Sequence, residues 1–332
     1  MREVRFHGCG DIRVEQIDEP VCGEGQRARN HENSRDWAGE EGLDPTCLRG
    51  YLRQRSYPHE YLHGPITIPR TAHSITGGRI PVTVAEIGPG VTRVKFGDRV
   101  AVKPNLYDGT CSCCVTARPN CCRNMAFIGL SNDAGGLSDQ IVVGEKHAIL
   151  LPEGFPLDLG ALVEPLTGAW LNRSSVRPGD TVLVVGGGPI GLAVVQVLKA
   201  HSIKSIVVSE VSPQRQLIAK VLGASKVLDP RTQDVVAMVR AMTAGPGPPL
   251  HLSAPGCKPA WTQPSAGFKC EHVIGSVIYE DGDFEAVIDA ISSGKLSPQD
   301  MITCKEDVVE RGFKALIDER DKHVKILVDV SA

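Results

Sequence analysis

Residues 182–192 read VLVVGGGPIGL, an apolar run that passes directly into a cluster of glycines. The spacing Gly186-x-Gly188-x-x-Gly191 stands at the end of this predicted strand and opens a predicted helix. In that context the first glycine permits a tight turn, the second lets the backbone approach a pyrophosphate, and the third lets helix and strand pack closely. Phosphates would meet the positive N-terminus of the helix. The pattern predicts a dinucleotide-binding turn made of Gly186, Gly188, Pro189, Ile190 and Gly191.

The second predicted strand of this region ends at Glu210, about 20 residues after Gly191. A carboxylate at this place can accept hydrogen bonds from both ribose hydroxyls and repels a 2′-phosphate, which favours NAD over NADP. Arg215 follows a few residues later and is a second candidate contact on the adenosine side. The alternative is a glycine-rich turn without a ligand, but strand, helix and acid together favour dinucleotide binding.

Two kinds of periodicity divide the chain. Short apolar strands alternate with amphipathic helices over residues 181–242, which predicts βαβ units and a parallel sheet. Residues 1–25 alternate apolar and polar side chains and predict a β-hairpin, and further strands make the first half β-rich. Residues 27–58 are polar without a period, and residues 244–271 are rich in proline without a strand pattern. We therefore expect both of these stretches to be irregular.

Five of the eleven cysteines lie in one short loop. The pattern D-x2-C-x2-C-x7-C is formed by Asp108, Cys111, Cys114 and Cys122. Closely spaced thiolates on one loop can close a tetrahedral zinc shell, whereas an aspartate is a harder ligand that weakens it. Cys113 or Cys121 could replace a neighbour. The alternative is a reduced, metal-free loop, but the spacing favours structural zinc.

Composition limits the classes of partner. With 332 residues, 42% hydrophobic and 23% charged, the chain has the mix of a globular protein of two domains. A net charge of −3 gives no reason to expect nucleic acid or an anionic membrane as a partner. No apolar run approaches the roughly 20 residues of a membrane span, and the N-terminus has no apolar signal region. We expect a cytoplasmic protein without a membrane partner.

These features together resemble the zinc-containing medium-chain alcohol dehydrogenases, in particular the sorbitol, threonine and (R,R)-butanediol dehydrogenase branch. The resemblance covers residues 1–26, about 59–243 and 272–332. Its more specific motifs are Arg5-Phe6-His7, Gly97-Asp98-Arg99-Val100, the cysteine loop, Leu162-Val163-Glu164-Pro165-Leu166, the glycine turn and His323-Val324-Lys325-Ile326-Leu327-Val328.

The resemblance implies an α/β protein with two domains. A GroES-like, β-rich catalytic domain would occupy residues 1–155, with the irregular insert at 27–58. A Rossmann domain with a doubly wound parallel sheet would occupy residues 156–280, made incomplete by the altered stretch 244–271. Residues 281–332 would return to the catalytic domain. Members of the family commonly form homodimers or homotetramers.

The implied activity is NAD-dependent oxidation of a small diol or polyol, such as 2,3-butanediol or sorbitol, to a ketone by hydride transfer. A catalytic zinc would polarise the alcohol oxygen. The sequence departs from the family here, because Gln54 stands where the zinc cysteine belongs and the G-H-E segment is absent. Glu164 is the recognisable remnant of the catalytic zinc site.

Three readings follow from this departure. An active dehydrogenase would need unrecognised zinc ligands, such as Cys47 or His59 with Glu164. A catalytically inactive relative, or the product of a defective gene model, would keep the dinucleotide turn and the structural zinc loop. A zinc-free reductase of the same superfamily is the third reading, and the cysteine loop and Glu164-Pro165-Leu166 point away from it.

Overall fold

The structure is a computed structural model that describes residues 1–8, 11–18, 47–52, 73–74, 80–88, 90–128, 136, 139–170, 176–243, 250–253, 278–306, 311–312, 315, 318–319 and 322–328. The chain packs as two compact units. The first unit comprises Met1–Glu164, Lys305–Lys314 and Ile326–Ala332, and the second comprises Pro165–Cys304 and Ala315–Lys325. The sequence-based limits 1–155, 156–280 and 281–332 stay a prediction, and the packing places residues 281–304 with the second unit.

The first unit begins with the predicted hairpin. Strands β1 (Arg2–Gly8) and β2 (Asp11–Gln16) pair in antiparallel fashion, with Val4 opposite Val14. Strand β4 (His73–Ser74) pairs with the other side of β1 and makes a three-stranded sheet. Arg2 forms an ion pair with Asp139 at 3.0 Å. Alternation of apolar and polar residues over the first sixteen positions was therefore a sufficient signal for this hairpin.

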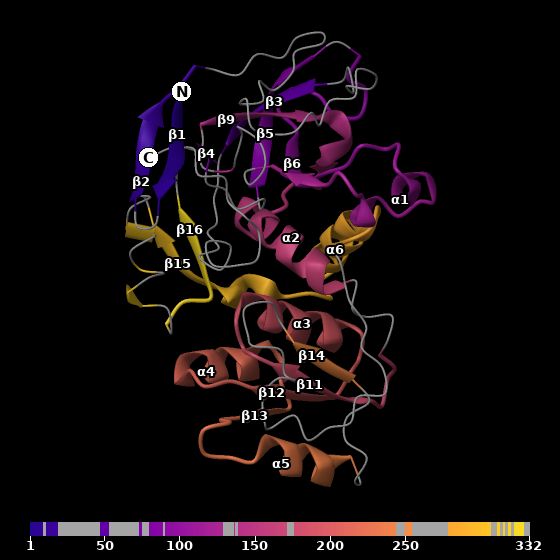
Figure 1. Ribbon diagram of the computed structural model, residues 1–332, viewed down its shortest axis with the longest axis vertical. Helices are drawn as coiled ribbons and strands as arrows, with labels where there is room; N and C mark the ends of the chain where they lie inside the picture. Colours follow the sequence, from indigo (N-terminus) through magenta and orange to yellow (C-terminus); the bar gives the residue numbers. More distant parts are fainter. Residues whose placement is uncertain are drawn as a thin grey trace. The chain divides into compact units, whose positions relative to one another are not determined.

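A five-stranded antiparallel sheet follows, in the order β10-β6-β5-β3-β9 (Figure 1). Its strands are β3 (Cys47–Leu52), β5 (Ile80–Ile87), β6 (Arg99–Val102), β9 (Gln140–Gly144) and β10 (Ala148–Leu150). Side chains that alternate along the strands form the core of this unit, and they include Val82, Val84, Val100, Val102, Ile141 and Val143.

Strand β3 corrects the expectation that residues 27–58 are irregular throughout. Its backbone lies between β5 and β9 and pairs with both, with Leu48 opposite Ile87 and opposite Val143. A strand that completes a sheet on both sides is stabilised by its ladder of hydrogen bonds, and this tertiary context outweighs a weak local pattern. The rest of residues 27–58 lies outside the described part of the chain.

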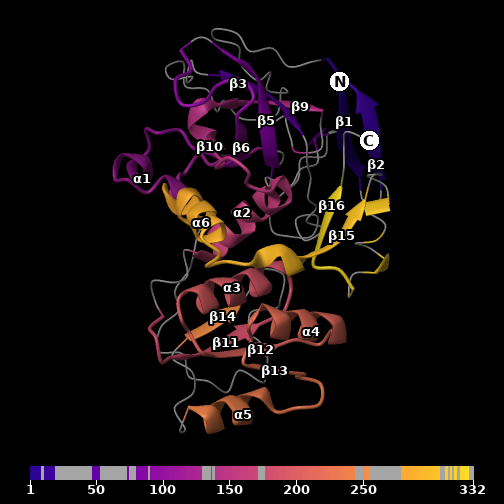
Figure 2. The same cartoon turned by 180° about the vertical axis from the view of Figure 1, so that it is seen from behind.

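The second unit contains a parallel sheet in the order β13-β12-β11-β14. Within the predicted alternating region lie strands β11 (Thr181–Val185), β12 (Ser205–Ser209) and β13 (Lys226–Leu228) and helices α3 (Pro189–Ala200), α4 (Pro213–Leu222) and α5 (Val235–Met242). Helix α6 (Asp283–Ser292) follows later in the chain. Helix α3 lies on one side of the sheet and α5 on the other (Figures 1 and 2). Val239 of α5 packs on Leu183, Val207 and Leu228 of three strands. The alternation of strand and helix thus produces the doubly wound arrangement.

Strand β14 (Leu250–Ser253) corrects the expectation for residues 244–271. It pairs in parallel with β11, with Val184 opposite Leu252. Prolines flank it in the sequence, and a run of only four residues is too short to show a clear period-2 pattern. Residues 254–277 lie outside the described part of the chain.

The described residues form further strands and α-helices outside these three sheets. They are β7 (Asn105–Leu106) and β8 (Ala126–Phe127), which pair with each other, α1 (Ser112–Val115), α2 (Leu157–Trp170), β15 (Ile302–Glu306) and β16 (Lys325–Val328). None of the described helices has the length and apolar character that a membrane crossing requires.

Candidate cofactor and metal sites

The glycine turn joins β11 to α3. Gly186 has a φ of 97°, in the left-handed region that side chains rarely adopt, and its N–H donates to the carbonyl oxygen of Ser209 at 2.9 Å. Gly188 caps α3, and its carbonyl oxygen accepts from the N–H of Leu192 at 2.9 Å. A Cβ on Gly191 would overlap the carbonyl oxygen of Gly186 and lie 3.1 Å from its carbonyl carbon. Helix and strand therefore meet too closely for any side chain at this position.

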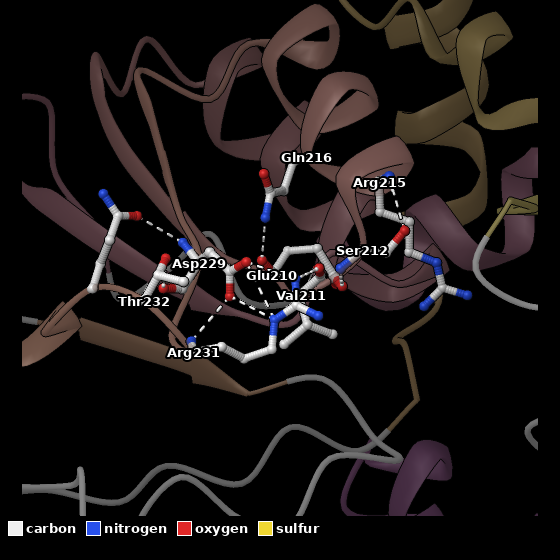
Figure 3. Close-up of polar contacts among 9 residues, drawn as sticks. Glu210, Val211, Ser212, Arg215, Gln216, Asp229, Arg231 and Thr232 are labelled. Atoms are coloured by element: carbon white, nitrogen blue, oxygen red, sulfur yellow. Dashed lines mark hydrogen bonds and ion pairs between the residues drawn. The ribbon is translucent and has the colours of Figure 1, made fainter.

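Glu210 closes the turn from the neighbouring strand. Glu210 is the first residue after β12, and it is only 6% exposed. The Oε2 atom accepts from the N–H of Gly187 at 2.6 Å, and Oε1 accepts from the N–H of Ser212 at 2.7 Å. Gln216 donates from its side-chain amide to the carbonyl oxygen of Glu210 at 2.7 Å (Figure 3). Each carboxylate oxygen has capacity for a further hydrogen bond, as two ribose hydroxyls would require.

Arg215 lies on α4, with its guanidinium turned away from Glu210 (Figure 3). Its backbone N–H donates to the hydroxyl oxygen of Ser212 at 3.3 Å, which caps the helix. Its Nη2 atom donates to the carbonyl oxygen of His323 at 3.3 Å. The structure thus engages this guanidinium with the segment before β16, and its contact with an adenosine stays a prediction.

A pair that the sequence analysis missed lies beside Glu210. Arg231 donates from Nε to Oδ1 of Asp229 at 3.0 Å and from Nη2 to Oδ2 at 2.7 Å (Figure 3). The same Nη2 atom donates to the carbonyl oxygen of Val211 at 2.7 Å. The carboxyl ends of neighbouring parallel strands meet at one edge of a sheet, where ligands bind in this class of fold. The position of Asp229 directly after the apolar pair Val227-Leu228 was the signal that could have revealed it.

The cysteine loop brings its four predicted ligands together. The ligand atoms of Asp108, Cys111, Cys114 and Cys122 all lie within 4.8 Å of one another. The Sγ atom of Cys111 is 3.5 Å from that of Cys114 and 3.9 Å from that of Cys122. Bonds of about 2.3 Å to a tetrahedral zinc would hold two sulfurs about 3.8 Å apart. The donor set therefore fits zinc in both geometry and chemistry.

Hydrogen bonds set the protonation of this loop. Backbone N–H groups of Cys111 and Thr110 hold the pKa of Asp108 well below its usual range, and the side-chain amide of Asn124 donates to its Oδ2 atom at 2.7 Å. Bonds from the backbone of Arg123 and Cys114 lower the pKa of Cys111 to about 7. An aspartate and one thiol are thus favoured as anions, which is the form in which they bind a cation.

Partial burial has the opposite effect on a third member of the loop. It raises the pKa of Cys114 to about 12, and the hydrogen bonds with the thiols of Cys111 and Cys122 act in the same direction. Removal of this proton has to accompany metal binding, because the thiolate is the ligand. Cys113 and Cys121 lie in the same loop but outside the group of four converging ligands.

Glu164 lies half-buried on α2, next to Pro165. Within the described residues, the group on the cysteine loop is the one cluster of three or more His, Cys, Asp or Glu that could hold a metal ion, and Glu164 is not in it. Cys47 contributes its backbone to β3, and Gln54 and His59 lie outside the described residues. The described side chains therefore do not fit a catalytic zinc, and the role of Glu164 stays a prediction.

Comparisons with known proteins agree with both halves of this description. Residues 45–153 match the family described as alcohol dehydrogenase GroES-like domain, and residues 189–266 match the family described as zinc-binding dehydrogenase. The (R,R)-butanediol dehydrogenase of Neisseria gonorrhoeae is 32% identical over 371 residues, which cover 99% of each chain.

Solved structures give the same result. The structure of 2R,3R-butanediol dehydrogenase from Bacillus subtilis has a TM-score of 0.79 and 30% identity, and covers 99% of each chain. A protein described as a short chain alcohol dehydrogenase from Escherichia coli, solved with NADH, has a TM-score of 0.79 and 25% identity over 99% of each chain. The predicted GroES-like and Rossmann fold class is confirmed. The chain belongs to the zinc-containing medium-chain alcohol dehydrogenase family, an oxidoreductase family, in its sorbitol and butanediol dehydrogenase branch.

Proposed function

We propose that this chain is an NAD-dependent oxidoreductase that acts on a small vicinal diol or polyol and forms a ketone by hydride transfer. The buried carboxylate of Glu210, held against the glycine turn, is the observation that carries the proposal. Bound NAD supplies the hydride acceptor. The substrate class comes from the relatives, which are named butanediol dehydrogenases. A homodimer or homotetramer in the cytoplasm remains our prediction.

The chain's own residues support binding of the adenosine half of the cofactor. Gly188 opens α3, whose N-terminal N–H groups and dipole favour a pyrophosphate. Glu210 accepts a hydrogen bond from Gly187 of this turn, and its carboxylate offers further acceptor capacity to ribose hydroxyls. Its negative charge disfavours a 2′-phosphate, so we propose NAD rather than NADP.

Zinc in the cysteine loop is the second part of the proposal. Three sulfurs and one carboxylate can surround one ion, and all four ligands come from a single loop of the first unit. Such a closed shell has a structural role, because a catalytic zinc needs an open position. Asp108 already orders this loop through its bonds from Thr110 and Cys111.

Substitution of Glu210 by glutamine tests the cofactor site. We expect the dissociation constant for NAD to rise about tenfold, because charge-assisted bonds to the ribose become weaker. The preference for NAD over NADP should fall, because the repelling charge is lost. Isothermal titration calorimetry with both cofactors measures the two constants. The control is Glu285→Gln, which removes an exposed carboxylate from α6 in the same unit. Equal NAD affinity in Glu210→Gln and the native protein would contradict the role of Glu210.

A second candidate function is favoured by one observation. Among the described residues, Glu164 is not part of a group of possible metal ligands. The sequence also has Gln54 where the family has a cysteine ligand. A relative without turnover would keep NAD binding and the structural zinc but lack the catalytic ion. We propose this reading as the alternative for the same fold.

Zinc content and turnover together separate the two candidates. The dehydrogenase predicts about two equivalents of zinc per chain, with one retained in Cys111→Ser/Cys114→Ser and lost on Glu164→Gln. The inactive relative predicts about one equivalent, which depends on the cysteines alone. Plasma emission gives the zinc content, and formation of NADH from 2,3-butanediol or sorbitol gives the turnover. Two equivalents with measurable turnover would eliminate the alternative.

A further inference from the structure

The ends of β12 and β13 place two more charged side chains next to Glu210. The N–H of Glu210 donates to the carbonyl oxygen of Leu228 at 3.0 Å, and Asp229 follows directly. Figure 3 shows Glu210, Asp229 and Arg231 gathered at this one edge. The carboxylate that would select the ribose and the guanidinium of Arg231 therefore belong to the same end of the sheet.

Arg231 donates to acceptors on the side chain of Asp229 and on the backbone of Val211. Both oxygens of Asp229 accept from its guanidinium, in the bidentate arrangement that suits a planar fork of donors. Its third acceptor is the carbonyl oxygen of Val211, the residue after Glu210. The guanidinium also lowers the pKa of Asp229 to about 2, so both partners are charged near neutral pH.

The turn that carries this pair is itself well bonded. The N–H groups of Thr232 and Gln233 donate to the carbonyl oxygen of Asp229 at 3.1 and 2.9 Å, and the N–H of Asp229 donates to the side chain of Gln233 at 2.8 Å. The N–H of Arg231 donates to Oδ1 of Asp229 at 2.9 Å. The backbone thus fixes where the arginine stands, whereas its side chain is 60% exposed and able to reorient.

Resting on the proposed use of NAD, we propose that Asp229 is a specificity-determining residue that withholds Arg231 from a 2′-phosphate and so disfavours NADP. The two cofactors differ by one phosphate on the adenosine ribose, and arginine is the side chain that binds such a group in this fold. Here Arg231 bonds to the carbonyl oxygen of Val211, the residue after Glu210. Its guanidinium also donates to both carboxylate oxygens of Asp229. Glu210 repels the phosphate, and Asp229 removes the cation that would attract it.

Asp229→Asn tests this assignment, because it removes the charge and preserves the size of the side chain. The probes are 5′-AMP and 2′,5′-ADP, which differ only in the 2′-phosphate, together with NAD and NADP. We expect the affinity for 2′,5′-ADP relative to 5′-AMP to rise about tenfold in this variant. The double variant Asp229→Asn/Arg231→Gln should lose the gain. Isothermal titration calorimetry measures all four ligands.

A matched control removes the same charge five residues away. Asp234 caps α5 by accepting from the N–H of Ala237 at 2.9 Å. Asp234→Asn should leave the ratio of the two affinities at the native value. Asp229→Ser is a second variant, and circular dichroism verifies that each variant is folded.

Three results would decide the matter. A gain in Asp229→Asn that disappears in the double variant supports the assignment. Binding of NAD and 5′-AMP by the native protein, with no gain in folded Asp229→Asn or Asp229→Ser, would overturn the role of Asp229 alone. Failure of the native protein to bind NAD or 5′-AMP would overturn the proposed NAD function, and this inference with it.

Discussion

Gly191→Ala is expected to abolish measurable NAD binding and to destabilise the second unit by about 3 kcal/mol. The added Cβ would overlap the carbonyl oxygen of Gly186, which is backbone and can move only if the turn moves. Displacement of the turn would separate α3 from β11 and misdirect the N–H groups meant for the phosphates. Loss of two charge-assisted bonds corresponds to a fall in affinity of more than about a hundredfold.

Gly168→Ala is the matched control for this prediction. A Cβ at Gly168, on α2, would meet nothing within 4 Å. The substitution should leave NAD affinity unchanged and stabilise the helix by about 0.5–1 kcal/mol. Urea unfolding and calorimetric titration measure the two effects. If Gly191→Ala bound NAD as the native protein does, the turn would not be the binding site.

Cys111→Ser/Cys114→Ser is expected to eliminate the zinc of the cysteine loop and to lower the melting temperature by about 10 °C. A ligand at a thousand times its dissociation constant stabilises the folded state by about 4 kcal/mol, which corresponds to a shift of this order. The same fall should follow treatment of the native protein with a chelator. Zinc analysis and differential scanning calorimetry provide the measurements.

The control for the loop is Cys304→Ser. Cys304 lies on β15, outside the cysteine loop, so its loss should change neither the zinc content nor the response to chelator. A further variant, Asp108→Cys, should bind zinc more tightly, because a thiolate is the softer ligand. If the native protein contained no zinc when purified from zinc-replete medium, the loop would be a metal-free turn ordered by Asp108.

Strong local patterns predicted most of the fold. Helices α3, α4 and α5 and strands β11 and β12 all lie within residues 181–242, where the sequence predicts alternating strands and helices. Strands β3 and β14 could not be predicted, because their pairing partners lie far away in the sequence and supply the stability. The local sequence of a strand says little about its formation when the stabilising contacts come from distant strands.

The candidate site shows the same division. The glycine turn and Glu210 could be found from spacing alone, because a fixed chemistry places them within one βαβ unit. The bond from Arg231 to Val211 could not, because it depends on how two parallel strands align at their ends. A full set of catalytic zinc ligands could not be assigned from the sequence, because Gln54 stands where the family has a cysteine and the G-H-E segment is absent.

The bond from Gly187 to Glu210 has a kinetic consequence. Because the turn is already ordered by the protein's own carboxylate, an arriving ligand need not select a rare loop conformation before it docks. Association with this half of the site should then be governed by diffusion and charge rather than by loop rearrangement. The residence time, set by how many bonds break together, becomes the quantity that evolution or an engineer can adjust.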